Sequence, residues 1–429
     1  MREMKDSGIE WIGEIPKHWT VKNLKYIFDI TSGSTPASGV SQYWDGDIKW
    51  ITPADFKTND VYVFGGRRNI TGLALMSCST QVIPDSSIIF SKRAPIGSVV
   101  ITGEKMCINQ GCLALVSKHQ KTSVKFYYYA LSILDKIFDM LGSGTTFKEI
   151  SAFRFSNTSL QCPHFEEQQQ IADFLDTQCS EIDATAEDIQ KEISLLEDYK
   201  KSVITEAVTK GLNPDAEMKD SGVKWLPKIP KHWKVIPSKY LFANSDIRRQ
   251  TGDEQLTASQ KYGIITQKDY TAKENAQIVL ATQGLEKWKH VEPNDFIISL
   301  RSFQGGLEMS KITGCITWHY VVLKAQKKVY HKYYKWLFKS ARYINALQGT
   351  CNFIRDGQDL RFSNFALVPL FELPLEEQQQ IADYLDTKCS EIDTLIADKK
   401  RQLDILTDYK KSLIYEYITG KKEVPVKDF

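Results

Sequence analysis

The chain has 429 residues, of which 42% are hydrophobic and 25% charged, a composition typical of a globular protein with two to four domains of roughly 100–200 residues. It contains no run of about 18 apolar residues that could cross a membrane, and its N-terminus lacks the apolar core of a signal peptide, so we expect a cytoplasmic protein. The eight cysteines form no C-x-x-C pair and have no clustered histidines, which disfavours a zinc site and a disulfide framework.

The first recognisable element is an N-terminal motif that occurs twice. MKDSG at 4–8 returns at 218–222, and IPKHW at 15–19 returns at 229–233. Self-similarity at a long, nearly constant spacing indicates internal duplication. The chain is therefore expected to consist of two halves of about 210 residues, each opened by this motif.

Each motif is followed by a region with short β-branched and aromatic runs, separated by Gly, Pro, Asn and Asp, which is a strand pattern. In the first half we predict strands within 86–91, 98–103 and 112–117, and in the second half within 295–300 and 319–325. An aromatic, helical stretch closes each region, at 125–141 and 332–347. We assign its aromatic side chains to the core rather than to base stacking.

A nearly identical segment ends each half. EEQQQIADFLDTQCSEID (166–183) and EEQQQIADYLDTKCSEID (376–393) agree at sixteen of eighteen positions. A preceding proline, acids at the expected helix start and apolar residues at 4-3 spacing predict two long amphipathic helices. The residues assigned to helix packing are Ile182, Ile189, Ile193, Leu196, Val203, Ile392, Ile396, Leu403, Leu406 and Leu413.

The partner of each helix is left open by the sequence. The economical solution is an antiparallel coiled coil between the two copies about a pseudo-twofold axis, and the alternative is an oligomerisation coiled coil. A helix over 182–208 would be roughly 40 Å long, close to one turn of DNA at roughly 34–36 Å. The predicted fold class is α+β. We expect a strand-rich domain at 1–162, a helical spacer at 163–215, a second strand-rich domain at 216–373 and a second helical spacer at 374–429.

The net charge of +2 conceals a segregation of charge. Residues 166–202 carry −8 and residues 376–412 carry −3, which leaves +13 for the rest of the chain. Such a separation indicates an anionic partner for the strand-rich domains, with nucleic acid foremost. The candidate DNA contacts are basic residues near predicted turns: Arg67, Arg68, Lys92, Arg93, Lys148, Arg248, Arg249, Lys268, Arg301 and Arg355. Arg93 and Arg301 occupy matching positions, where a structural salt bridge is the alternative to a DNA contact.

The sequence contains no recognisable catalytic motif. It has no Pro-Pro dipeptide for the base-holding loop of an amino-methyltransferase, no Walker A loop, no G-x-S-x-G and no H-E-x-x-H. Asp45, Asp47 and Lys49 resemble part of a metal nuclease site, but they lack a partner acid, and a turn leading into a strand explains them as well. We therefore expect a binding protein without a metal or cofactor of its own.

The chain resembles the specificity subunit of type I restriction–modification systems. The resemblance rests on the motif SGIEWIGEIPKHW, on YWDGDIKWITPADF (43–56), SKRAPIGSVVI (91–101) and GTTFKEIS (144–151), and on the duplicated EEQQQIAD segment. It implies two target-recognition domains, each reading one half of a bipartite, asymmetric DNA site. It also implies that the helices set the gap between half-sites and dock two modification subunits.

The resemblance assigns the chemistry to partners. Modification subunits would supply S-adenosylmethionine and adenine methylation, and restriction subunits would supply ATP- and Mg-dependent translocation and cleavage. In the second domain SLRSFQGGLEM replaces the SKRAPIGSVVI type, which predicts unrelated half-sites. The competing hypothesis is a coiled-coil scaffold whose two divergent domains bind proteins, and the charge segregation argues against it.

Overall fold

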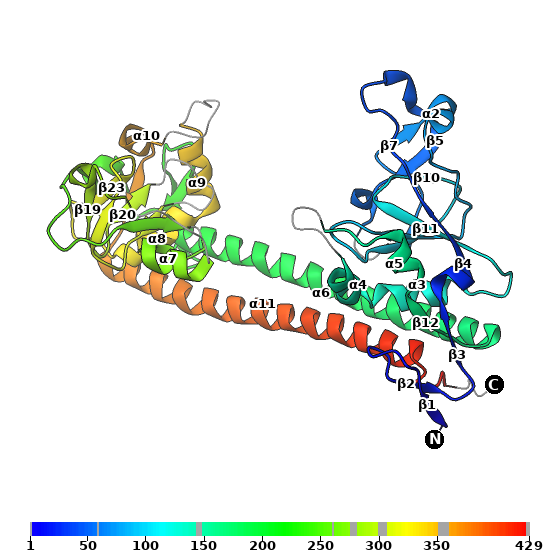
Figure 1. Cartoon of the computed structure of the whole chain (residues 1–429). Helices are drawn as coiled ribbons and strands as arrows, with labels where there is room; N and C mark the ends of the chain where they lie inside the picture. Colours follow the sequence, from blue (N-terminus) through cyan, green and yellow to red (C-terminus); the bar gives the residue numbers. More distant parts are fainter. Residues whose placement is uncertain are drawn as a thin grey trace. The chain divides into compact units, whose positions relative to one another are not determined.

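The computed structural model describes residues 2–57, 60–142, 148–259, 261–274, 281–298, 307–350 and 360–425 (Figure 1). It divides into two compact units: unit 1 is Met1–Gln190 with Arg401–Phe429, and unit 2 is Lys191–Lys400. The long helices α6 (Phe165–Lys210) and α11 (Leu375–Ile418) each contribute to both units. The boundaries predicted from the sequence separate helices from strand-rich domains, whereas compactness divides each long helix between the units.

The core of unit 1 is a five-stranded sheet in the order β4-β11-β8-β9-β6, antiparallel except for the β6–β9 pair. Its strands are β4 (Phe28–Ser32), β11 (Cys112–Ser117), β8 (Ile88–Ser91), β9 (Val99–Thr102) and β6 (Tyr62–Val63). The three strands predicted in this half are β8, β9 and β11. Ile88, Ile89 and Phe90 are all fully buried, so both faces of β8 are covered.

Unit 1 has a second sheet of three strands, and its middle strand contains the DGDIKW segment (45–50). This sheet consists of β10 (Cys107–Ile108), β5 (Trp44–Ile51) and β7 (Arg68–Ile70), in that order, and the pairing of β5 with β7 is irregular between Trp44 and Ile48. The helices are α1 (Leu24–Ile27), α2 (Gly72–Ser77), α3 (Val124–Ser132), α4 (Asp135–Leu141) and α5 (Ala152–Ser156), with short 3₁₀ turns at Ser41–Tyr43 and Pro53–Asp55.

The sheet of unit 2 repeats four strands of the unit 1 sheet, in the order β16-β23-β20-β21. These strands are β16 (Phe242–Ser245), β23 (Val321–Ala325), β20 (Phe296–Ile298) and β21 (Glu308–Met309). Two further antiparallel pairs accompany it, β17 (Leu256–Ser259) with β18 (Gly263–Thr266) and β19 (Lys289–Val291) with β22 (Gly314–Ile316). The helices are α7 (Gln267–Glu274), α8 (His331–Lys339), α9 (Ala341–Gln348) and α10 (Phe362–Leu367), with 3₁₀ turns at Ser238–Tyr240 and Leu285–Lys287.

Each aromatic stretch predicted as helical forms two helices rather than one. In unit 1 the break lies at Ile133 and Leu134, between α3 and α4. In unit 2 it lies at Ser340, whose hydroxyl accepts a hydrogen bond from the backbone N–H of Tyr343 and so caps the start of α9. In both units the helices cover the sheet, and their aromatic side chains are buried with it.

The duplicated N-terminal motif forms the same hairpin twice. In unit 1, β1 (Met4–Asp6) pairs with β2 (Glu14–Pro16), and in unit 2, β13 (Met218–Asp220) pairs with β14 (Lys228–Pro230) in the same register. After each hairpin, the strand that enters the strand-rich domain pairs with the strand that leaves it. In unit 1 these are β3 (Thr20–Asn23) and β12 (Ser159–Cys162), and in unit 2 they are β15 (Lys234–Ile236) and β24 (Leu370–Glu372). The predicted α+β fold with an internal repeat is confirmed.

Candidate nucleic-acid interface

The duplicated acidic motif holds the N-terminal motif of its own half. In unit 1 the indole Nε1 of Trp19 donates to Oε2 of Glu167 at 2.8 Å, and Nε2 of His18 lies 3.0 Å from the same oxygen. Arg2 forms an ion pair with the other oxygen. Burial acts to raise the pKa of Glu167, but its hydrogen bonds to His18, Arg2 and Trp19 outweigh burial and lower that pKa.

Unit 2 has the same contact between the equivalent residues of its own half. Nε1 of Trp233 donates to Oε1 of Glu377 at 3.0 Å, and Nε2 of His232 lies 2.8 Å from Oε2. Trp233, like Trp19, is fully buried. The second glutamate of each EEQQQIAD segment therefore anchors a buried tryptophan, which is a structural role.

The glutamine that follows joins the long helix to the strand-rich domain. Oε1 of Gln168 accepts from the backbone N–H of Ser123, the residue that caps α3. Oε1 of Gln378 accepts in the same way from the backbone N–H of Tyr330, just before α8. Because both glutamines are buried and bonded to backbone, the duplicated segment orients each domain on its helix.

The two long helices pack against each other within each unit. In unit 1, Nζ of Lys410 lies 2.6 Å from Asp183, and the rings of Phe174 and Tyr417 meet at 4.5 Å. Moving back along α6 thus corresponds to moving forward along α11, so this part of the pair is antiparallel.

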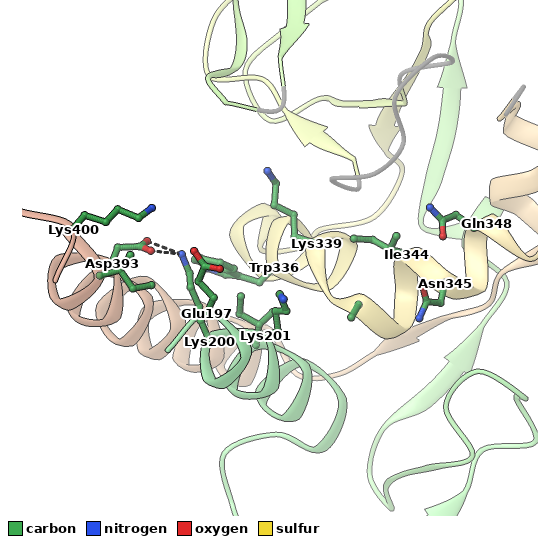
Figure 2. A pocket seen from close by; sticks show the side chains of 13 residues that line it. Glu197, Lys200, Lys201, Trp336, Lys339, Ile344, Asn345, Gln348, Asp393 and Lys400 are labelled. Atoms are coloured by element: carbon green, nitrogen blue, oxygen red, sulfur yellow. Dashed lines mark hydrogen bonds and ion pairs between the residues drawn. The ribbon is translucent and has the colours of Figure 1, made fainter. Parts of the chain in front are cut away.

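Unit 2 shows the same antiparallel pairing with the roles of the copies exchanged. Nζ of Lys200 lies 2.6 Å from Asp393, and Nζ of Lys399 lies 2.5 Å from Glu192. Figure 2 shows the Lys200–Asp393 pair. Lys200 and Asp393 are the repeat mates of Lys410 and Asp183. Lys200 and Lys410 are therefore each paired with an aspartate of the other long helix.

All ten residues assigned to helix packing are covered. Five of them are buried: Ile193, Val203, Ile392, Ile396 and Leu413. The other five are half-buried: Ile182, Ile189, Leu196, Leu403 and Leu406. Burial of one stripe on each helix agrees with packing of α6 on α11.

A second contact joins each strand-rich domain to the frame, by which we mean the two long helices α6 and α11, and a cavity lies beside this contact. In unit 1 the hydroxyl of Tyr129 on α3 donates to Asp176 of α6 at 2.7 Å. In unit 2 the indole of Trp336 on α8 donates to Asp386 of α11 at 2.9 Å. The adjacent cavity of about 720 Å³ in unit 2 is lined by Trp336 together with Lys200 (Figure 2). The matching cavity of unit 1, about 540 Å³, is lined by Tyr129 and by residues that include the repeat mate of Lys200.

The basic candidates of unit 1 lie in two places. Arg67 and Arg68 stand at the start of β7, where the guanidinium of Arg68 lies 4.1 Å from the ring centre of Trp44. Arg67 is exposed, with Asp55 at 3.8 Å. Nη2 of Arg68 also lies 3.7 Å from Asp45, so each of the two arginines has a carboxylate neighbour within the unit.

The second place is the ion-pair cluster around Glu149. Arg93 Nε lies 2.8 Å and Lys92 Nζ 3.0 Å from its carboxylate, and Lys148 is paired with Asp139 at 2.6 Å. Burial acts to raise the pKa of Glu149, but the hydrogen bonds from Arg93 and Lys92 lower it. The contact agrees with the structural alternative for Arg93, and its DNA contact stays a prediction.

In unit 2, Arg248 and Arg249 lie beside β19. Arg248 donates from Nη1 to the carbonyl of Lys287 at 2.8 Å, and the backbone N–H of Arg249 donates to Trp288. Lys268 is exposed on α7, away from them in sequence. Arg301 and Arg355 lie outside the described residues.

Sequence reasoning missed an exposed aromatic pair in unit 2. Trp318 and His319 lie in the turn between β22 and β23, with their rings stacked 3.5 Å apart. The strand predicted over 319–325 begins only at Val321, because the preceding residues form this turn. The alignment of the two halves contains a signal for this pair. Trp318 and His319 align with Gln110 and Gly111, so a bulky aromatic residue stands in the second half where the first half has a polar one.

No helix among the described residues is long and apolar enough to cross a membrane. In the same ranges, no three His, Cys, Asp or Glu side chains gather in a way that could hold a metal ion.

The comparisons with known proteins agree with this architecture. Residues 16–195 match the family model of the type I restriction modification DNA specificity domain. The type I restriction enzyme MjaIX specificity subunit of Methanocaldococcus jannaschii is 36% identical over 188 residues, which are 43% of this chain and 43% of that protein. The match thus spans less than half the length of this relative.

Two solved structures share the fold over nearly the whole chain. A chain from a study of complex assembly and conformational transition of the type I restriction–modification system has a TM-score of 0.70 at 13% identity, covering 95% of this chain and 99% of that one. The HsdS subunit from Thermoanaerobacter tengcongensis has a TM-score of 0.51 at 14% identity, covering 95% and 98%. Residues 16–195 are similar to the type I restriction modification DNA specificity domain, and the predicted resemblance of the chain to type I specificity subunits is confirmed.

Proposed function

We propose that this chain is the non-catalytic DNA-specificity subunit of a type I restriction–modification complex and that each strand-rich domain reads one half of a bipartite, asymmetric DNA site. The observation that carries the proposal is the contrast between a duplicated frame and divergent surfaces. In both units the glutamate, Glu167 or Glu377, holds a histidine and a buried tryptophan, and a Lys–Asp pair joins the two helices. The side chains that the domains expose differ.

The helices are proposed to set the gap between half-sites. Within each unit the two helices pack antiparallel and are joined by crossed ion pairs, and a spacer built on helices holds a distance better than a loop does. The charge distribution supports the division of labour, because the helices are acidic while the remaining chain carries +13.

Two modification subunits are proposed to dock on equivalent places of the helices. Leu195 and Tyr199 on α6 are 68% and 50% exposed, and their repeat mates Ile405 and Tyr409 on α11 are 59% and 52% exposed. An apolar pair one turn apart that stays uncovered in both copies favours a protein partner that binds twice.

The chemistry then belongs to the partners. S-adenosylmethionine would be bound by the modification subunits, and ATP and Mg by the restriction subunits, at DNA in the cytoplasm. This chain would contribute the choice of site and the positions of the partners.

The decisive experiment is co-expression of the chain with its modification subunit, followed by genome-wide mapping of methylated adenines. The expected result is one bipartite motif with two unrelated half-sites and a constant gap. Methylation or cleavage by the purified chain alone would contradict the non-catalytic role. The scaffold alternative predicts no DNA binding, whereas specific binding should weaken steeply with salt.

A further inference from the structure

The turn between β22 and β23 carries the most exposed tryptophan of the described residues. Trp318 is 52% exposed, and the backbone N–H of Tyr320 donates to the carbonyl of Thr317 to close the turn. The ring of His319 stacks on the indole at 3.5 Å with an interplanar angle of 29°. Stacking fixes the indole, so little side-chain entropy remains to be lost when a ligand binds its open face.

Cationic side chains lie at the same end of this small sheet. Ile316, two residues before Trp318, is the register partner of Lys289, and Lys289 is bridged in turn to Arg248. The backbones of Ile316 and Arg248 are therefore two strand spacings apart, which is roughly 10 Å. This separation is less than the width of the DNA major groove, about 12 Å. Arg248 and Arg249 are exposed. A fixed aromatic surface beside exposed arginines is a combination found at nucleic-acid interfaces.

The matching turn of unit 1 has different chemistry on the same support. β10 and β11 are joined at residues 109–111, and Asn109 Oδ1 accepts from the backbone N–H of Gly111 at 2.9 Å. Gln110, exposed at the tip and hydrogen-bonded to Thr35, aligns with Trp318. Cys107 and Cys315, which precede the two turns, are both fully buried. The support is therefore kept while the tip residue differs.

We propose that Trp318 is a base-contacting residue of the second half-site and that it reads a thymine through apolar contact with the C5-methyl group. Apart from one N–H donor, the indole offers only apolar surface, and the thymine methyl is the apolar feature that the major groove presents. The inference rests on the proposed function and names one determinant within it.

The test uses the complex of the full chain with its modification subunit. Trp318→Ala should relax one T·A position of the second half-site, with discrimination there falling about tenfold, while the first half-site is unchanged. Tyr240→Ala is the matched control, because Tyr240 is 55% exposed in the same unit but lies outside the turn, and it should change neither half-site. Gln110→Ala should change the first half-site alone.

A probe on the wild-type complex avoids any folding effect of a variant. Each thymine of the second half-site is replaced in turn by deoxyuridine, which removes only the methyl group. Affinity should fall about fourfold at one position, and Trp318→Ala should abolish that sensitivity. A second half-site that is indifferent to every such replacement, or unchanged in Trp318→Ala, overturns this inference. Failure of the wild-type complex to methylate any bipartite site overturns the proposed function instead.

Discussion

In unit 1 the turn between β10 and β11 presents Gln110, and in unit 2 the matching turn between β22 and β23 presents Trp318. Deeper in the same units, Glu167 and Glu377 hold Trp19 and Trp233 in the same way. The contrast shows that buried contacts between motif, helix and sheet tolerate little change, because loss of a buried partner is costly. The exposed turn residues are not subject to this restraint, so the two strand-rich domains can differ there while the long helices and the buried contacts stay the same.

The largest effect is expected from lengthening the frame. Seven residues inserted after Gln190 in α6 and after Lys400 in α11 keep the phase of the apolar stripe and add about 10 Å to both helices. The gap between half-sites should grow by about three base pairs, as read from the methylated-adenine motif.

The insertion in α6 alone is the informative control. It shifts α6 against α11, so the Lys200–Asp393 and Lys410–Asp183 pairs no longer fit one register. We expect it to abolish methylation at any bipartite site. An unchanged gap in the double insertion would exclude the helices as the spacing element.

The second prediction tests whether the units bind equivalent partners. Tyr199→Asp and Tyr409→Asp should each remove one of two modification subunits, because a charge in an apolar contact is costly to bury. Native mass spectrometry of the complex would show one bound subunit for each variant and none for the double variant. Tyr26→Asp, which changes an exposed tyrosine of α1 in unit 1, outside the two long helices, should keep both. Full occupancy in the double variant would refute the docking surface.

The third prediction uses a difference between the two anchors. Glu167 binds Arg2 as well as His18 and Trp19, whereas Ala216 stands at the position of Arg2 in the second half. Glu167→Ala should therefore destabilise its unit by about 3 kcal/mol, and Glu377→Ala should destabilise its own by less.

Thermal unfolding would measure the loss of stability from these anchors. Hydrogen exchange would assign it to the β1–β2 or β13–β14 hairpin. Equal losses would mean that Arg2 adds nothing to the anchor of unit 1.

The smallest effect concerns two glutamates with opposite pKa shifts. Arg93 and Lys92 lower the pKa of Glu149 against the effect of burial, whereas burial raises the pKa of Glu308 in spite of Lys339. The Glu149 pair thus stabilises the fold above the unfolded pKa of its carboxyl and loses this contribution as the pH falls through the lowered pKa. The Glu308 carboxyl has the opposite pH dependence. Its contribution to stability is present below its unfolded pKa, and it is lost as the pH rises through the raised pKa.

Glu149→Gln should accordingly cost less than about 1 kcal/mol at pH 7, and this cost should shrink as the pH falls through the lowered pKa of Glu149. Glu308→Gln should be neutral or slightly stabilising at pH 7, since it removes a charge that burial disfavours. Urea unfolding across this pH range provides the measurement. The same pH profile for both variants would contradict the assignment.

Periodicity and repetition predicted the frame well. The long helices and the strands β8, β9, β11, β20 and β23 follow from apolar spacing and turn residues, which are local properties of the chain. The same local view could not find the break between α3 and α4, or the cap at Ser340, because an aromatic run continues through both.

The basic residues show where local reasoning ends. Arg93 was recognised by its place after a strand, but its partner Glu149 lies 56 residues away, and only folding brings the two together. The sequence does not single out Trp318, because its neighbours predict a buried strand. Exposure, which distinguishes a core aromatic from a binding residue, depends on the whole tertiary environment.

The sequence by itself determined that this protein is a duplication of a strand-rich domain and a long helix, since repeated motifs and apolar periodicity are written in the order of residues. Tertiary structure alone decided which groups meet. It showed that Lys200 and Lys410 pair with aspartates of the opposite helix, that the repeated glutamates hold buried tryptophans, and that two equivalent turns expose an amide and an indole. These outcomes depend on distances between residues far apart in the chain, and such distances exist only once the apolar surfaces have packed.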